Sequence, residues 1–153
     1  DLAPLDQQAA MIQELFPDAK NIGLLYCSAE ANSQYQVDEM TKYLTELGLT
    51  ATAFAFTDTN DVASVAQAAC DASDVLYIPT DNTAASNTEA IANVVLPAKV
   101  PVIAGEAGIC EGCGIATLSI SYYDLGVATG KMYNAANCEA LGVTIPDGYE
   151  PMG

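Results

Sequence analysis

The sequence contains no histidine, no arginine and no tryptophan, and it has only four lysines among 153 residues. Without histidine, the commonest general base and metal-binding side chain is missing, which excludes Ser–His and Cys–His catalytic pairs. Without arginine, the chain lacks the planar side chain that clamps phosphate and carboxylate groups through two hydrogen bonds. An anionic ligand would have to rely on backbone N–H groups, hydroxyl groups or one of the lysines.

Positive charge is scarce, and negative charge is abundant. Twenty aspartates and glutamates give a formal net charge of −16. Such a surface repels phosphate backbones and anionic membranes, so nucleic acid is excluded as a partner, and a cationic or zwitterionic ligand fits better. Acidity of this degree also keeps an exported protein soluble, so charge alone does not identify a ligand.

The sequence also lacks long apolar runs and an evident targeting segment. No run approaches the ~20 apolar residues that a transmembrane helix needs. The chain opens with Asp1-Leu2-Ala3-Pro4, which is not the basic and then apolar pattern of a signal peptide. We expect that such a peptide was removed or was never part of this sequence, and the length suits one domain.

Short apolar or alternating runs separated by helical patterns fill most of the chain. The predicted strands are Asn21–Cys27, Thr50–Thr57, Val75–Pro79, Val100–Gly105 and Ile115–Ser121. Apolar residues at helical spacing predict helices at 5–16, before Gly48, after Asp58–Asp61, from Asn82 or Thr83 to Val95, and at 122–141. Residues 106–114 form a loop or a short helix.

This alternation predicts an α/β fold with right-handed crossovers and a parallel sheet. Five predicted strands, each followed by a helix or a short connection, favour a flavodoxin-like three-layer sandwich. Its five-stranded parallel sheet would have the order 2-1-3-4-5. We predict one domain over residues 1–142 and an irregular tail over 143–153.

Polar side chains gather where the predicted strands end. In the order 2-1-3-4-5, the loop at 28–33 lies beside Thr80–Thr83, at the point where such sheets bind ligands. Glu106 joins them from the fourth strand, and Tyr122 follows the fifth. Asp81, Asn82 and Thr83 are equally what a helix N-cap requires, and Tyr122 and Tyr123 are equally suited to packing.

Other flavodoxin-like functions lack their motifs. A phospho-acceptor domain needs acids after the first strand and a lysine after the fifth, whereas these places hold Tyr26-Cys27-Ser28 and Ser119-Ile120-Ser121. The loop at 28–33 has no glycine and carries Glu30, which is unlike a flavin-phosphate loop, and no glycine-rich nucleotide motif is present. No cofactor is predicted.

Five cysteines stand at positions 27, 70, 110, 113 and 138. Cys27, Cys70 and Cys138 are interpreted as small buried apolar residues. The spacing of Cys110 and Cys113 favours a local disulfide, with two free thiols as the second interpretation, because neither a second such pair nor a histidine completes a zinc site.

The chain from about residue 1 to 132 resembles the second lobe of ABC-transporter substrate-binding proteins of the type I periplasmic-binding-protein fold, closest to the tryptophan and tyrosine subfamily. The resemblance rests on N-I-G-L-L-Y with S-A-E-A-N-S at 21–33, N-D-V at 60–62, Y-I-P-T-D-N-T at 77–83, P-V-I-A-G-E at 101–106 and S-I-S-Y-Y-D-L-G at 119–126. It implies a bilobal, non-enzymatic, exported and often lipid-anchored protein that closes on a small solute and delivers it to a membrane permease.

The resemblance also implies a set of ligand-facing residues. These are Glu30, Asn32, Ser33, Asp81, Asn82, Thr83, Glu106, Ser121 and Tyr122. The family often has an aspartate, expected to meet an amino group, where this chain has Ser121.

Two departures concern the extent of the chain. The family's first lobe is missing, and Met132 runs directly into Tyr133, whereas in the family that C-terminal stretch follows a longer helix and a further crossing. Since Leu125, Thr129, Met132, Ala136 and Ala140 keep helical phase, we hypothesise an excised or engineered single lobe. The alternatives are a structural domain without ligand binding and a flavodoxin-like enzyme, and an exposed face with Tyr122 and Tyr123 could drive self-association.

Overall fold

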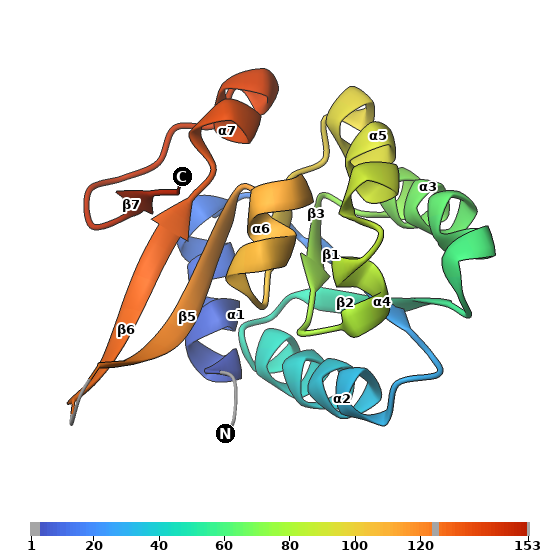
Figure 1. Ribbon diagram of the computed structural model, residues 1–153, viewed down its shortest axis with the longest axis horizontal. Helices are drawn as coiled ribbons and strands as arrows, with labels where there is room; N and C mark the ends of the chain where they lie inside the picture. Colours follow the sequence, from blue (N-terminus) through green and yellow to red (C-terminus); the bar gives the residue numbers. More distant parts are fainter. Residues whose placement is uncertain (1–3, 124–125, 153) are drawn as a thin grey trace.

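A mostly parallel sheet with helices on both faces forms the centre of the computed structural model (Figure 1). The structure describes residues 4–123 and 126–152, and it describes no side chain between 119 and 129. The strands are β1 Asn21–Cys27, β2 Thr50–Phe56, β3 Val75–Ile78, β4 Val102–Ala104, β5 Ala116–Tyr123, β6 Gly126–Tyr133 and β7 Glu150–Pro151. Their order in the sheet is β2-β1-β3-β4-β5-β6-β7.

The helices divide the core into two layers. They are α1 Leu5–Leu15, α2 Ala31–Glu46, α3 Val62–Ala72, α4 Asn82–Ala85, α5 Thr88–Ala98, α6 Ala107–Cys113 and α7 Ala135–Leu141, with a 3-10 turn η1 at Thr59–Asp61. One apolar cluster joins the sheet to α1 and α2, and the other joins it to α3, α5 and α6. Because both faces are covered, β1 is buried from Ile22 to Cys27, as its unbroken apolar run predicts.

The predicted fold class and the order of the first five strands are confirmed. All neighbouring pairs from β2 to β5 are parallel. The predicted number of strands is wrong, because the sheet continues to seven. β6 pairs antiparallel with β5, from Ala116 opposite Tyr133 to Tyr123 opposite Gly126, and β7 pairs parallel with β6.

The predicted helix over residues 122–141 is therefore wrong in its first half. Gly126–Tyr133 forms β6, and only Ala135–Leu141 is helical. The sequence G-V-A-T-G-K-M-Y carries two glycines and two β-branched residues, which disfavour a helix, and pairing along all of β5 satisfies its backbone groups. The supposed helical phase across Met132 and Tyr133 does not exist, and the tail holds the short strand β7.

Two boundaries around α4 and α5 also differ from the prediction. A single helix from Asn82 or Thr83 to Val95 is replaced by two, α4 and α5, and Pro97 lies inside α5. The helix ends instead at Ala98, and its C-cap Lys99 adopts a left-handed backbone with φ 62°. The N-cap of α4 is Asp81.

Cys110 and Cys113 lie in α6 as buried free thiols, so the preferred disulfide is wrong and the second interpretation holds. Burial raises the pKa of each thiol to about 12. They are therefore neutral and poorly nucleophilic at physiological pH. Cys27, Cys70 and Cys138 are buried, as predicted.

Candidate functional site

The loop after β1 and the loop after β3 meet at the carboxyl edge of the sheet, as the strand order predicts. One carboxylate oxygen of Glu30 accepts a hydrogen bond from the Asn82 amide at 3.0 Å. The other accepts bonds from the Thr83 amide at 2.8 Å and the Thr83 hydroxyl at 2.7 Å. Glu30 thus links two segments that lie more than fifty residues apart in the chain. It accepts hydrogen bonds from the first two backbone amides of α4.

Asp81 is buried beneath this contact, with 1% of its surface exposed. Its carboxylate accepts the Cys27 amide at 2.8 Å through one oxygen and the Ala84 amide at 2.8 Å through the other. It therefore ties the end of β1 to the start of α4. Both oxygens are engaged inside the protein, which gives Asp81 a positioning role in the structure.

The start of α2 holds the same loop from a second side. The Ser33 hydroxyl donates to the Thr80 carbonyl at 3.2 Å. Gln36 donates to the same carbonyl at 3.0 Å and accepts from the Thr80 amide at 3.1 Å. Sequence reasoning missed Gln36, although it stands one helical turn before Met40 on the buried side of α2, where an amide is unexpected.

The two glutamates of the site have opposite electrostatic environments. Burial alone would raise the pKa of Glu30, but the hydrogen bonds from Thr83 and Asn82 outweigh it and hold the pKa below its usual value. The pKa of Glu106, the N-cap residue of α6, is raised by burial and by the nearby Asp81 charge. In the described part of the chain, no group donates a hydrogen bond to the Glu106 carboxylate.

The other predicted residues lie around this core. Asn32 and Asn82 are exposed, and Thr83 is half-buried. Ser121 and Tyr122 belong to β5, but their side chains are outside the described residues, as is that of Tyr123. Ser121 stands four residues beyond Thr117, the last residue of β5 that pairs with β4, which corresponds to roughly 13 Å along the strand.

The residues brought together offer hydrogen-bonding groups of several kinds. Glu30, Asp81 and Glu106 are acidic, and their neighbours contribute amide and hydroxyl groups. Among the described side chains, no group of three histidine, cysteine or acidic residues is placed to hold a metal ion. The chemistry suits hydrogen bonding to a polar small molecule with a positively charged group.

Comparison with known proteins agrees with this geometry. A family model described as ABC transporter substrate binding protein matches residues 1–136. The chain belongs to this family. Members of the ABC transporter substrate-binding proteins are, in general, binding proteins and not enzymes, and they typically work outside the cytoplasm.

Individual relatives within the family have named ligands. A tyrosine-binding protein of Clostridioides difficile strain R20291 is 30% identical over 132 residues, which cover 86% of this chain and 38% of that protein. A domain from Streptococcus pneumonia, solved in complex with L-Trp, is 28% identical with a TM-score of 0.86, covering 95% of this chain and 59% of its own.

A third relative shows the same lobe without ligand. The open form of a substrate-binding protein with adhesive properties from Clostridium difficile is 27% identical with a TM-score of 0.88, covering 99% of this chain and 60% of that one. The chain thus spans between 38% and 60% of the length of these relatives. None of the described helices is long and apolar enough to cross a membrane.

Proposed function

We propose that this chain is a solute-binding lobe of an ABC transporter substrate-binding protein and that its ligand is a small, amino-acid-like molecule, with aromatic amino acids as the first candidates. The relatives named for tyrosine and solved with L-Trp support this ligand class. In this proposal the chain is not an enzyme, works outside the cytoplasm, and belongs with a first lobe and a membrane permease.

The observation that carries the proposal is the state of Glu106. Its carboxylate is partly buried beside Asp81 without a hydrogen-bond donor from the described residues. Partial burial beside another carboxylate disfavours the ionised form of Glu106, and a ligand ammonium group would offset that cost by pairing with it. Glu106 would therefore take the place of the aspartate that the family often has at the position of Ser121.

The other residues would set the shape of the site. Asn32, Asn82 and Thr83 would offer amide and hydroxyl groups to the polar part of the ligand. Glu30, Ser33 and Asp81 would act indirectly, since their described hydrogen bonds hold the loops in place. Ser121 and Tyr122 remain predicted contacts from β5.

Calorimetric titration with tyrosine, tryptophan and phenylalanine tests the proposal. We expect saturable but weak binding, because closure of a second lobe contributes much of the affinity in bilobal receptors. The Glu106→Gln variant should bind about tenfold or more weakly, since a charge-assisted hydrogen bond is lost. Glu111→Gln, an exposed acid on the same helix, is the matched control.

Two results would contradict the proposal. Equal affinity for the amino acids and for their deaminated analogues would show that no ammonium group is recognised. The absence of saturable heat with any of these compounds would favour a structural domain that does not bind ligand.

A further inference from the structure

The outer edge of β2 is a free edge of the sheet. β2 stands first in the strand order, at the end away from β6 and β7. In the described part of the chain it pairs with β1 alone, in parallel, from Asn21 opposite Thr50 to Cys27 opposite Phe56. A strand in this position presents backbone N–H and C=O groups that another strand can pair with.

The register with β1 identifies the residues whose backbone groups face outward. The Thr50 amide donates to a carbonyl just before β1, and the Phe56 carbonyl accepts from an amide just after β1, both at 2.9 Å. Since backbone direction alternates along a strand, Ala51, Ala53 and Ala55 turn their N–H and C=O groups away from β1. These groups have no hydrogen-bond partner among the described residues.

The outward amides on either side of this stretch are already bonded. The Leu49 amide donates to the Leu44 carbonyl at 3.0 Å. The Thr57 amide donates to the carboxylate of Asp61 at 3.0 Å. The free amides of the edge therefore belong to the three alanines, and the free stretch is symmetric about Ala53.

None of the usual devices that protect a sheet edge is present in β2. Such edges carry charged side chains, proline or a bulge. Residues 47–57 contain neither a charged residue nor proline, and the register with β1 runs without a bulge. Ala53 and Ala55 are exposed, and their methyl groups leave room for a further strand. In a chain of net charge −16, an uncharged stretch is also where two copies meet with the least repulsion.

From this edge we propose that two copies of the chain associate through β2, in antiparallel orientation, about a two-fold axis at Ala53. Ala53 then faces Ala53 of the second copy, and Ala51 faces Ala55 of that copy. Each facing pair exchanges two N–H···O=C bonds, so the axis uses the free groups of both edges completely. On the face toward α3, Phe54 of one copy lies opposite Thr52 of the other.

The symmetry of the free stretch favours a second copy over a foreign strand, because the same three residues supply donors and acceptors on both sides. A basic peptide is the alternative occupant, since the chain is acidic. Salt separates the two cases. Screening weakens the attraction between a basic peptide and this chain, whereas it strengthens the association of two copies that each carry a charge of −16.

Sedimentation velocity and amide hydrogen exchange on the same chain test the proposal. A monomer should give way to a dimer over an about hundredfold rise in concentration, and sodium chloride should increase the dimer fraction. Exchange at Ala51, Ala53 and Ala55 should slow about tenfold once about nine tenths of the chains are paired. The amides of Thr52 and Phe54, which face β1, should be protected at every concentration and serve as the internal control.

Ala53→Lys is the sharpest variant. It places like charges directly opposite each other at the axis and should weaken the dimer about tenfold or more, although it lowers the net negative charge. Ala136→Lys, at an exposed position of α7, makes the same change of charge away from β2 and should not weaken the dimer. Ala53→Pro removes the central amide without adding charge and should weaken the dimer as well. Circular dichroism melts check that each variant folds.

Three results would overturn the proposal. One is a chain that stays monomeric at every concentration and salt, and another is a dimer that persists in Ala53→Lys. The third is protection of the three alanine amides by a lysine-rich peptide in a chain that is monomeric alone, which would assign the edge to a basic partner. None of these measurements uses a solute or Glu106, so they leave the proposed binding function untouched.

Discussion

Glu30 and Glu106 border the same site, yet the protein treats their charges in opposite ways. Glu30 receives three hydrogen bonds from Asn82 and Thr83, which stabilise its ionised form. Glu106 is partly buried next to Asp81, which destabilises its ionised form. The ionised form of one carboxylate therefore contributes to the stability of the fold, and the ionised form of the other lowers it.

The two residues should give opposite dependences of stability on pH. Because folding raises the pKa of Glu106 above its usual 4.5, stability is lost as pH rises through that raised pKa. Glu106→Gln should therefore be more stable than the parent at neutral pH and equally stable below pH 4.5. Because folding lowers the pKa of Glu30, its contribution is present above 4.5 and is lost as pH falls through the lowered pKa, so Glu30→Gln should be less stable at neutral pH.

Thermal unfolding followed by circular dichroism between neutral and acidic pH measures both effects. The parent and the two variants are compared under identical salt. If both variants shifted the melting temperature in the same direction at neutral pH, the electrostatic assignment of one glutamate would be wrong.

Asp81 is expected to matter for stability more than for direct ligand contact. Asp81→Ala leaves the buried amides of Cys27 and Ala84 without acceptors, which should lower the free energy of unfolding by about 2–4 kcal/mol. Asn82→Ala, an exposed neighbour, should change it by less than about 0.5 kcal/mol. Urea denaturation measures the free energy of unfolding of both variants. If Asp81→Ala changed it as little as Asn82→Ala does, the positioning role of Asp81 would be wrong.

At the scale of elements, the close approach of β4 to the end of β3 depends on Gly105. A Cβ atom there would lie 2.9 Å from the Pro79 carbonyl carbon and 2.9 Å from the Thr80 nitrogen. Both are backbone atoms of the loop that leads to Asp81. The Gly105 amide also donates to the Ile78 carbonyl at 2.7 Å, which closes the space further.

Gly105→Ala should therefore destabilise the protein by about 1–3 kcal/mol, because the backbone of β3 or β4 must move. Gly108→Ala in α6 is the matched control, since its Cβ would lie 3.8 Å from Glu106 and alanine favours a helix by about 0.5–1 kcal/mol. Urea denaturation should show opposite signs for the two variants. A stabilising Gly105→Ala would mean that the strands can separate without cost.

The elements also show where sequence reasoning succeeds and where it fails. The stretches at 22–27 and 75–78 are unbroken apolar runs that are buried on both faces, and such runs predict strands of a parallel sheet. The apolar spacing of the stretch at 126–133 predicts part of a helix, whereas the stretch forms a strand that pairs with β5. That contact depends on tertiary structure, although Gly126 and Gly130 already disfavour a helix.

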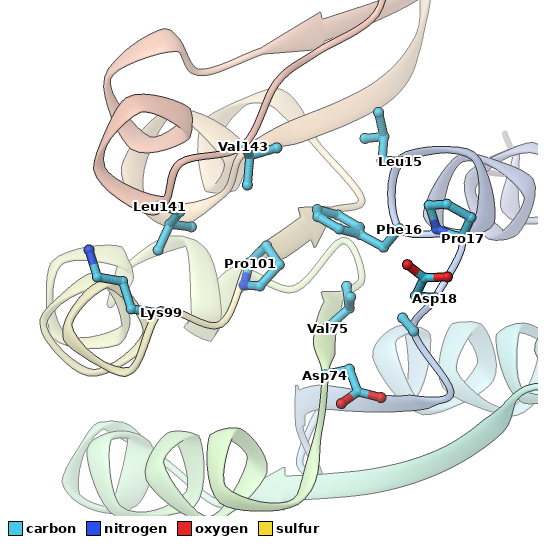
Figure 2. A pocket seen from close by; sticks show the side chains of 11 residues that line it. Leu15, Phe16, Pro17, Asp18, Asp74, Val75, Lys99, Pro101, Leu141 and Val143 are labelled. Carbon is cyan, nitrogen blue, oxygen red and sulfur yellow. The ribbon is translucent and has the colours of Figure 1, made fainter.

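The sequence also predicts one part of the candidate site and not another. The meeting of the loops at Glu30 and Thr83 follows from the strand order, which the alternation of elements predicts. The division of roles between Asp81 and Glu106 does not follow, because it depends on which carboxylate receives amide hydrogen bonds. At the opposite edge of the sheet, where β3 and β4 begin, Phe16 and Val143 line a recess (Figure 2). Its lining residues lie more than 120 residues apart in the chain, so no local sequence pattern predicts it.

At the scale of the whole molecule, the net charge of −16 should make stability depend on ionic strength. Repulsion among unpaired acids favours the expanded chain, and raising salt from about 10 mM to about 0.5 M shortens the screening length from about 30 Å to a few ångströms. We expect the melting temperature to rise over this range. Calorimetric melts in sodium chloride measure the change.

A charge-reduced variant serves as the control for this prediction. Glu46→Gln, Glu139→Gln and Asp147→Asn combined remove three exposed acids. The increase in melting temperature with salt should be smaller in this variant than in the parent. An equal increase in both would show that salt acts through a route other than charge repulsion.

The separation of Glu30 and Thr83 along the chain also bears on the order of folding. β1 and β3 lie side by side, but β2 and α3 are made between them, so a ribosome must release the chain beyond residue 83 before the two loops can touch. Contacts between such distant segments form late, since the intervening chain must first be ordered. The contacts among Glu30, Asn82 and Thr83 therefore cannot form until more than half of the chain has been made, whereas β1 and β2 can already pair before that point.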